Sequence, residues 1–391
     1  MIDKAVEKQS CTGCKMCGDL CPENAVKFKD DNEGFWYPVV SNNCTNCGMC
    51  LKQCPVLVEI AASGAQTPAV YAAWIKDDGI RVKSTSGGLY YALAETALKE
   101  NRYISGCVFS EDWKSAKHIV GNTYDDLDRI YRSKYFQSDT EGVYKLIEKL
   151  LESDEKVLFC GTPCQNAALT AYLGKNHDTL IQCDFICRGM NSPKAHRFHI
   201  SELEQKYKAE VEFFNFKNKK QGWTALGLFV KFKNGKTSFT NLVTSAWTRG
   251  YIGSNLYMRP CCEHCRFKKL PRVSDITLGD YWGLNKNKED MEKGMSVVMI
   301  NTEKGKSFYE KTLPRIHSEN STFEQALAGN GCILHPPIFN HKKRAEFFRR
   351  IENENFSDIV FDLENVSKFR IFLSDKKRQV TRWARLMGLM R

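Results

Sequence analysis

The chain has 391 residues, including 17 cysteines, and its formal net charge is +11. Residues 368–391 hold eight Lys/Arg and one Asp, so they account for +7 of this charge; the rest is nearly balanced, which argues against a nucleic-acid-binding protein. The sequence has no run of 18 apolar residues, and its first ten residues do not resemble a signal peptide. We therefore expect a cytoplasmic protein with reduced thiols, long enough for several domains.

The first 55 residues contain two copies of the pattern C-x2-C-x2-C-x3-C-P, ending at Pro22 and Pro55. Bacterial ferredoxins with two [4Fe–4S] clusters use this pattern, and the fourth cysteine of each run binds the other cluster. The spacing thus predicts two ligand sets: Cys11, Cys14, Cys17 and Cys54 for one cluster, and Cys44, Cys47, Cys50 and Cys21 for the other. We expect residues 1–58 to form a ferredoxin-like 2[4Fe–4S] domain that transfers single electrons.

Three other interpretations of these cysteines fit the pattern less well. Structural zinc commonly takes two C-x2-C pairs, and a repeated run of four ending in proline fits this pattern poorly. Disulfides need an oxidising compartment, which nothing in the sequence indicates. A purely structural role in a scaffold protein is the third alternative, and the ferredoxin spacing argues against it.

Residues 59–68 are rich in Ala, Ser, Gly and Thr and are predicted to be a linker. Strand-like and helical patterns then alternate, which predicts βαβ units in an α/β domain with a mixed, largely parallel sheet over residues 69–340. The expected strands cover residues 69–75, 103–109, 156–160 and 180–186, and the expected helices cover residues 89–99, 140–151, 165–173 and 194–206. Further, partly antiparallel strands are expected at 211–216, 227–232 and 296–300.

Hydroxyl and small residues precede the helix expected at Leu89, in the segment Ser84-Thr85-Ser86-Gly87-Gly88. Such a segment at a helix N-terminus offers backbone N–H groups to a phosphate or pyrophosphate, although Ser and Gly also cap ordinary helices. Iron–sulfur clusters pass one electron at a time and commonly serve a cofactor that pairs electrons. A flavin diphosphate meets both requirements.

A second set of cysteines follows the strands of this domain. Cys164 comes after the strand that ends at Cys160, and Cys187 ends the next strand. If these strands are parallel neighbours, both thiols lie at the carboxyl edge of the sheet, where open α/β sheets bind ligands. Cys262 and Cys265 could join them around a third [4Fe–4S] cluster.

Alternatives remain for this second set. Cys261 could replace Cys262, and the 262/265 pair could belong to a small zinc site with His264 as fourth ligand. The remaining cysteines are interpreted as packing residues: Cys107, Cys160, Cys183 and Cys332.

Residues 341–391 are predicted to be a basic helical tail. Val380, Trp383, Met387 and Met390 recur at three- and four-residue spacing, which is typical of an amphipathic helix. The helix either packs on its own domain or docks to an acidic partner protein or an anionic membrane surface.

Several motifs between residues 69 and 340 together resemble the coenzyme F420-reducing hydrogenase beta-subunit family, which includes F420H2 dehydrogenase subunits and 7-hydroxymethyl chlorophyll a reductase. They are Ser84-Thr85-Ser86-Gly87-Gly88, Lys134-Tyr135-Phe136-Gln137-Ser138, Gly161-Thr162-Pro163-Cys164-Gln165, Cys187-Arg188-Gly189, Cys262-x2-Cys265 and the segment from Ser274 to Gly283. Arg188 departs from the His-Gly that is more usual after this cysteine.

The resemblance implies an FAD on the α/β domain and a [4Fe–4S] cluster near it, held by Cys164, Cys187, Cys262 and Cys265. It also implies that the flavin lies along Ser84, Ser86, Gly87, Gly88, Gln137 and Ser138. Asp280 is the candidate catalytic residue that positions flavin or substrate; a structural Asp turn is the equal alternative.

We therefore expect an iron–sulfur flavoprotein oxidoreductase that couples one-electron transfer through [4Fe–4S] clusters to two-electron chemistry at FAD. Ferredoxin or reduced coenzyme F420, a deazaflavin, is the expected electron partner, and the organic substrate is not identified by the sequence. The alternative is an electron-transfer subunit that relays electrons to a partner enzyme without a substrate of its own.

Overall fold

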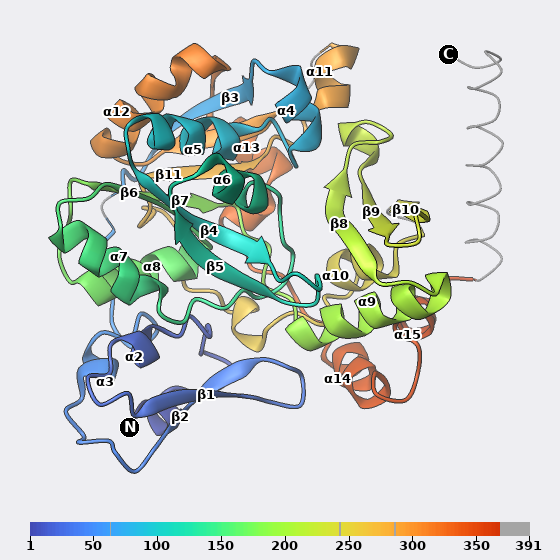
Figure 1. The fold of residues 1–391 in the computed structure, drawn as a ribbon, viewed down its shortest axis with the longest axis horizontal. Coiled ribbons are helices and arrows are strands. Elements are labelled where there is room, and N and C mark those ends of the chain that lie inside the picture. The colour runs from blue at the N-terminus through green and yellow to red at the C-terminus, as the bar shows by residue number, and fades with distance from the viewer. Residues whose placement is uncertain (63, 242–243, 285–286, 368–391) are drawn as a thin grey trace.

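The computed structural model describes residues 1–62, 64–241, 244–284 and 287–367, and shows a mixed α/β body with a small N-terminal module below it (Figure 1). The body is built on an eight-stranded sheet of order β13-β3-β12-β11-β7-β6-β4-β5. The strands, in that order, are Ile316–Ser321, Ala69–Ile75, Ser296–Ile300, Ile276–Asp280, Leu180–Phe185, Val157–Cys160, Tyr103–Phe109 and Ala116–Gly121. The expected α/β class is confirmed.

The centre of the sheet is parallel and its edges are antiparallel. Strands β11, β7, β6 and β4 are parallel neighbours, whereas β5 pairs antiparallel with β4, and β12 pairs antiparallel with both β11 and β3. The mixed sheet that the alternating pattern predicted is therefore present. The edge strands β5 and β13 and the central strand β11 were not expected from the sequence.

Both faces of the central strands are covered by helices, which explains why these strands are apolar throughout. In β6, Leu158 packs toward α5 (Leu89–Lys99), whereas Val157 and Phe159 pack toward α7 (Val143–Glu152) and α8 (Pro163–Leu173). The other helices around the sheet are α4 (Asp78–Lys83), α6 (Tyr124–Ile130), α11 (Lys288–Lys293), α12 (Glu303–Thr312) and α13 (Phe323–Gly329).

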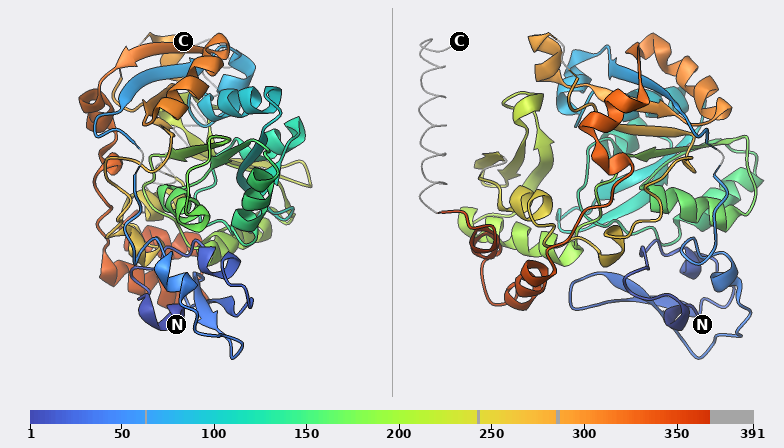
Figure 2. Two further views of the ribbon diagram at one scale, coloured as in Figure 1. Left: turned by 90° about the vertical axis from the view of Figure 1, so that its left-hand side faces the viewer. Right: turned by 180° about the vertical axis from the view of Figure 1, so that it is seen from behind.

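A three-stranded antiparallel sheet of order β10-β9-β8 stands beside the large sheet (Figures 1 and 2). Its strands are β8 (Val211–Asn218), β9 (Gly227–Phe232) and β10 (Thr237–Asn241), and it packs with α9 (Pro193–Tyr207), α10 (Ala246–Ile252), α14 (His341–Arg350) and α15 (Phe356–Leu363). Phe347 and Phe356 lie against Tyr257, so residues 341–363 share this core. The predicted amphipathic segment from Val380 to Met390 lies outside the described residues.

The N-terminal module contains a hairpin that the sequence analysis did not predict, formed by β1 (Val26–Asp30) and β2 (Trp36–Val40). The two cysteine runs adopt the same local conformation. Gly13 and Lys15 in the first run, and Asn46 and Gly48 in the second, all have φ between 57° and 74°. Each run then enters a short helix, α2 (Met16–Asp19) or α3 (Met49–Lys52); a third, α1 (Ile2–Ala5), lies at the N-terminus.

Charged and polar contacts fix the module to the body. The Lys15 ammonium donates to Asp139 Oδ2 at 2.7 Å and Glu141 Oε2 at 2.8 Å, and the Asp19 carboxylate accepts the N–H groups of Gly142 and Tyr144. Two of these contacts fall at the N-terminus of α7, where a carboxylate is favoured. Lys15 and Asp19 are themselves buried, so the first cysteine run lies at the interface.

Gly13 provides a test of this interface. A Cβ at Gly13 would lie 2.4 Å from Gln137 Nε2 and 2.7 Å from Arg259 Nη1, and the φ of +65° strains any other residue. We expect Gly13→Ala to lower the free energy of unfolding by about 1–3 kcal/mol and to increase proteolysis within residues 59–68. Chemical denaturation and limited proteolysis measure both effects.

Gly48→Ala is the matched control, because Gly48 has a φ of +74° but a Cβ added there would meet nothing within 4 Å. Gly48→Ala should lower the free energy of unfolding by only about 1 kcal/mol and leave proteolysis within residues 59–68 unchanged. Equal effects of the two substitutions would show that the clash with Gln137 and Arg259 is unimportant.

Candidate functional site

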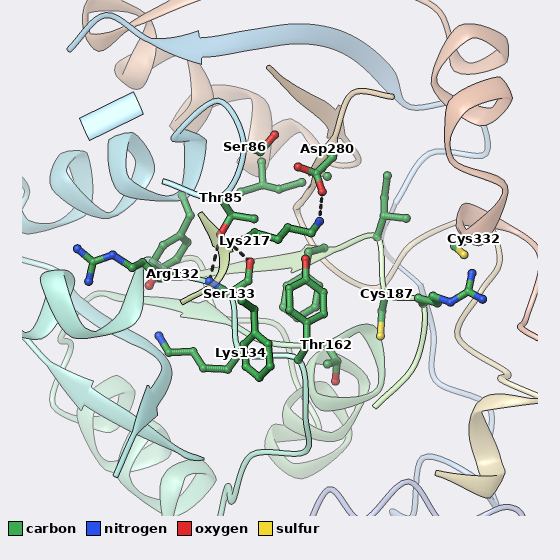
Figure 3. Close-up of a pocket in the computed structure, with 18 of the residues that line it drawn as sticks. Thr85, Ser86, Arg132, Ser133, Lys134, Thr162, Cys187, Lys217, Asp280 and Cys332 are labelled. Atoms are coloured by element: carbon green, nitrogen blue, oxygen red, sulfur yellow. Dashed lines mark hydrogen bonds and ion pairs between the residues drawn. The ribbon is translucent and has the colours of Figure 1, made fainter. Parts of the chain in front are cut away.

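A cavity of about 830 Å³ lies at the carboxyl ends of the central strands. Its walls include residues that follow three of these strands: Gly161 after β6, Ile186 after β7 and Asp280 at the end of β11. Open α/β sheets bind ligands at this edge, and the volume lies in the upper part of the range for small-molecule and cofactor sites. The lining is mainly apolar with a few charged and hydroxyl groups, and Figure 3 shows Lys217 and Asp280 paired among them.

The loop from Ser84 to Gly88 forms one wall at the N-terminus of α5, as expected. Ser84, Ser86 and Gly88 line the cavity, whereas Gly87 is packed against the sheet. A Cβ at Gly87 would lie 2.6 Å from the Ala73 carbonyl oxygen, and the Gly87 N–H donates to Ser296 Oγ at 2.9 Å. The absence of a side chain at Gly87 thus allows the loop to pack closely against β3 and β12.

A second loop, residues 132–134, lies beside the first loop and also lines the cavity. The Ser133 N–H and hydroxyl both donate to Thr85 Oγ1, which ties the two loops together (Figure 3). Arg132 and Lys134 add positive charge to this wall. Burial lowers the pKa of Lys134 to about 8, so an anion beside it would restore the stability of its charged form.

Asp280 lines the cavity but is not a free carboxylate. Its Oδ2 accepts from Lys217 Nζ at 2.5 Å, and its Oδ1 accepts from Trp223 Nε1 at 3.3 Å. Burial lowers the pKa of Lys217, but Asp280 and the Tyr135 hydroxyl outweigh this effect and raise it above the usual lysine range. The site therefore presents a fixed ammonium–carboxylate pair, and the sequence analysis had identified only its acid.

Ser138 also lines the cavity, as part of a hydrogen-bonded chain. Gln165 Nε2 donates to Ser138 Oγ at 3.1 Å, and His118 contacts Ser138 Oγ through Nδ1 and the Cys160 carbonyl through Nε2. Because the carbonyl only accepts, Nε2 carries the proton and Nδ1 accepts from Ser138. The sequence analysis did not single out His118.

Gln137 does not line the cavity, although it was expected along the flavin with Ser138. Its Nε2 donates to the carbonyls of Thr12 and Gly13, each at 3.2 Å, and its Oε1 accepts from Arg259. Backbone alternation explains the difference, since consecutive residues of an extended segment point to opposite sides. The side chain of Gln137 holds the N-terminal module.

The first predicted ligand set is brought together within the N-terminal module. Burial, together with the neighbouring thiols of Cys54 and Cys11, raises the pKa of Cys14 to about 12. Burial also raises the pKa of Cys17, with contributions from Cys14, Cys11 and Cys54. Each thiol in this set therefore lies near the others, including Cys54 from the second run.

The second predicted set surrounds a cavity of its own. A space of about 180 Å³ is lined by all four expected ligands, Cys21, Cys44, Cys47 and Cys50, with apolar walls that include Ile2 and Leu51. Here too the fourth cysteine comes from the other run. Cys47 is exposed, so this space lies at the surface of the module.

The third predicted set joins three separate segments. Burial raises the pKa of Cys164, and the neighbouring thiols of Cys265, Cys187 and Cys262 raise it further. Thr162 Oγ1 lies 3.0 Å from Cys164 Sγ, and the Met190 N–H donates to Cys262 Sγ at 3.4 Å. A hydrogen bond from Cys261 lowers the pKa of Cys262, which favours Cys262 as the thiolate of this adjacent pair.

Cys187 connects this third set to the central cavity, because it also lines the cavity wall. Three of the cysteines interpreted as packing residues, Cys107, Cys160 and Cys332, border the same space, and only Cys183 is fully enclosed. Among the described residues, no three His, Cys, Asp or Glu side chains are grouped closely enough to hold a single metal ion.

The comparisons with known proteins identify both parts of the chain. Residues 154–325 match the family described as the C terminus of the coenzyme F420 hydrogenase/dehydrogenase beta subunit, and residues 10–58 match the 4Fe-4S dicluster domain. One similar solved chain is from the F420-reducing [NiFe] hydrogenase complex of Methanosarcina barkeri, with 17% identity and a TM-score of 0.47 over 71% of this chain and 93% of that chain. No curated protein matches the chain.

Residues 154–325 thus match the C-terminal domain of the F420 hydrogenase/dehydrogenase beta-subunit family, behind a segment that matches a 4Fe-4S dicluster domain, and the resemblance inferred from the sequence is confirmed. Cys164, Cys187, Cys262, Cys265 and Asp280 fall within the matched range. The loop from Ser84 to Gly88 lies outside it. In the part of the chain that the structure describes, no helix has the length and apolarity needed to cross a membrane.

The buried His118 makes stability depend on pH. Burial lowers its pKa from 6.5 to about 4, so between these values the unfolded chain binds more protons, and the free energy of unfolding falls as the pH drops. In urea titrations between about pH 7 and pH 4.5, the free energy of unfolding of His118→Gln should therefore fall less steeply than that of wild type. The difference in slope should be up to about 1.4 kcal/mol per pH unit.

The exposed His317 on edge strand β13 provides the control, and His317→Gln should retain the wild-type slope. The buried neutral state assigned to His118 would be wrong if His118→Gln and wild type lost stability in parallel over this range.

Proposed function

We propose that the chain is an iron–sulfur flavoprotein oxidoreductase with three [4Fe–4S] clusters and one FAD. Its electron partner is ferredoxin or coenzyme F420. The observation that carries the proposal is the position of Cys187, which borders the large cavity on one side and the group of Cys164, Cys262 and Cys265 on the other. A cofactor in the cavity would therefore lie beside a cluster.

The cavity fits a flavin dinucleotide in its chemistry. The N-terminus of α5 with Thr85 and Ser86, beside the loop that carries Arg132 and Lys134, suits a pyrophosphate, because a helix N-terminus with hydroxyl groups lies next to cationic residues there. The apolar walls, among them Tyr135 and Ile186, suit an aromatic ring system. When bound, FAD would exchange a hydride with an organic partner and single electrons with the clusters.

The residues of the chain have defined tasks in this proposal. Thr85 and Ser133 hold the phosphate-facing loops together, and Gly87 seats the first loop on β3 and β12. Asp280 keeps the Lys217 side chain protonated at the cavity wall, where the ammonium N–H groups would stabilise negative charge on a ring or substrate. Asp280 is therefore proposed to position Lys217 instead of transferring a proton itself.

The thiol groups form a series from the surface to the cavity. Cys47 of the second set is exposed, the first set lies at the interface between module and body, and the third set lies against the cavity. Thr140 Oγ1 donates to the Cys14 carbonyl at 2.7 Å, which fixes the first set to the segment before α7. The order supports electron transfer through the module to the flavin site.

An electron-transfer subunit without a substrate of its own is the alternative. A protein partner would then take the place of the organic substrate, and the Lys217–Asp280 pair would only shape the cavity. Hydrogen activation, where it occurs, would belong to another polypeptide.

Cys164→Ser tests the third cluster. Serine is a poor ligand for iron, so anaerobically reconstituted variant should hold about 8 iron atoms instead of about 12, with both N-terminal clusters intact. Electron transfer between the flavin and the N-terminal clusters should fall at least tenfold. Iron analysis and EPR of reduced samples measure the first effect, and stopped-flow absorbance measures the second.

Cys183→Ser is the matched control, because Cys183 is buried on the neighbouring strand β7 and belongs to none of the three sets. It should retain about 12 iron atoms. Wild-type protein that binds zinc and no iron, or never takes up flavin, would contradict the proposed function.

Asp280→Asn, compared with wild type, distinguishes an enzyme with its own organic substrate from an electron-transfer subunit without one. Without its carboxylate partner the buried Lys217 loses its proton more readily, so turnover with an organic hydride acceptor should fall at least tenfold while flavin reduction by the clusters persists. Unchanged turnover would contradict the role proposed for the Lys217–Asp280 pair, whereas wild-type protein that turns over no organic acceptor but passes electrons to a protein partner would favour the electron-transfer subunit.

A further inference from the structure

Arg259 is completely buried where the N-terminal module meets the body. All three of its guanidinium nitrogens donate hydrogen bonds: Nε to the Cys11 carbonyl at 2.7 Å, Nη1 to Gln137 Oε1 at 2.8 Å, and Nη2 to the Trp36 carbonyl at 3.0 Å. Two of these acceptors belong to the module. The side chain is therefore held in one position against the first cysteine run.

The backbone of the same residue belongs to the third cysteine group. The Arg259 carbonyl accepts from the Cys262 N–H at 3.0 Å, and the Arg259 N–H donates to the Met190 carbonyl at 2.7 Å. Met190 in turn donates its N–H to Cys262 Sγ. Arg259 thus lies between the site of Cys11 and the site of Cys262, and contacts both.

The charge of Arg259 has no protein counter-ion among the described residues, since its acceptors are two carbonyls and an amide. Other buried arginines differ: Arg81 pairs with Asp290 at 3.0 Å, and Arg344 pairs with Glu33. The ring of Tyr37, with its centroid 4.4 Å from the guanidinium carbon, compensates only a small part of the positive charge of Arg259. Burying a cation without a partner costs several kcal/mol.

A [4Fe–4S] cluster with four thiolate ligands carries a net negative charge in both of its usual oxidation states, and this charge grows by one on reduction. A fixed cation nearby therefore stabilises the reduced form and raises the reduction potential. Arg259 contacts the backbone at one ligand of each of two predicted clusters, so its charge acts on both.

We propose that Arg259 is the shared counter-cation of the Cys11 and Cys262 clusters and raises the reduction potentials of both, so that the reduced form of each cluster is stabilised. This inference rests on the proposed function, because it assigns a role to Arg259 only if the clusters are present. The inference adds to the proposed function a residue that sets the reduction potentials of the clusters on both sides of the interface between the module and the body.

The test uses the full-length chain, reconstituted anaerobically with iron, sulfide and FAD. Redox titrations followed by EPR should show that Arg259→Gln keeps about 12 iron atoms but moves two of the three cluster potentials to more negative values. The cluster bound by Cys21, Cys44, Cys47 and Cys50, remote from Arg259, should keep its potential. Arg259→Lys, which preserves the charge, should show a smaller shift.

Arg344→Gln is the matched control. Arg344 is also buried and joins the module to the body through Glu33, but none of its contacts involves a cysteine. It should leave all three potentials unchanged. A shift in Arg344→Gln, or one in Arg259→Lys equal to that in Arg259→Gln, would attribute the effect to packing and overturn the proposal.

Gln137→Glu provides a second route if Arg259→Gln fails to retain iron. It places a carboxylate oxygen where Nη1 now donates to an amide oxygen, and so neutralises the charge without removing the arginine, although it also removes the hydrogen bonds from the amide to the carbonyls of Thr12 and Gly13. The same two potentials should become more negative, and unchanged potentials would overturn the proposal. Wild-type protein without iron would contradict the proposed function and this inference with it, whereas iron-loaded variants with wild-type potentials contradict only the role of Arg259.

Discussion

The parallel pairing of β6 with β7 is the constraint on which the site depends. It sets Cys160 opposite Cys183, so the segments that follow the two strands leave the sheet at the same edge. Asn166 fixes this arrangement, because its side-chain amide donates to the carbonyls of Gly161, Thr162 and Cys183. With both segments held, the thiols of Cys164 and Cys187 face the same region, and the loop carrying Cys262 needs only to close over it.

The second requirement is that the N-terminal module remains in a fixed orientation. Electron transfer by tunnelling falls steeply with distance, so a module on a flexible linker would serve the third cysteine group poorly. The structure meets this requirement with buried, charge-assisted contacts, since Lys15, Asp19 and Arg259 all lie within or against the first cysteine run. Such bonds are directional, and they place the run in a single register on the body. Apolar packing adds to them, because Met16 shares a core with residues of α7 and α8.

Much of the local structure could be predicted from the sequence. The strands Ala69–Ile75, Tyr103–Phe109 and Gly227–Phe232 and the helix Leu89–Lys99 coincide with the expected ranges, because each has a clear apolar period between turn residues. The β1–β2 hairpin was missed, since its strands are short and only partly buried. The edge strand β5 was missed because the segment Ala116–Gly121 carries Lys and His among its apolar residues.

The site could be predicted from the sequence only where the spacing between residues indicates which ligands act together. The cysteine runs define their partners through a repeated pattern, whereas Lys217, His118 and Arg259 are single residues with no local signal in the sequence. Each acquires its role from a residue far along the chain: Lys217 from Asp280, His118 from Ser138, and Arg259 from Cys11. Gln137 illustrates the same limit, because its neighbour Ser138 lines the cavity while its own side chain turns to the opposite side.

On the proposed function, the exposure of the cysteine groups restricts where electrons can cross the protein surface. Cys164 and Cys262 are buried and the cysteines of the first run are partly buried, whereas Cys47 is exposed. Around Cys47 lie Asn46 and Met49, which are exposed and uncharged. A protein electron partner would therefore reach the series of clusters at this end, while a small organic partner would use the large cavity at the other. On this proposal the length of that series would separate the two reactions, so the protein would exchange electrons with one partner while the second stays bound.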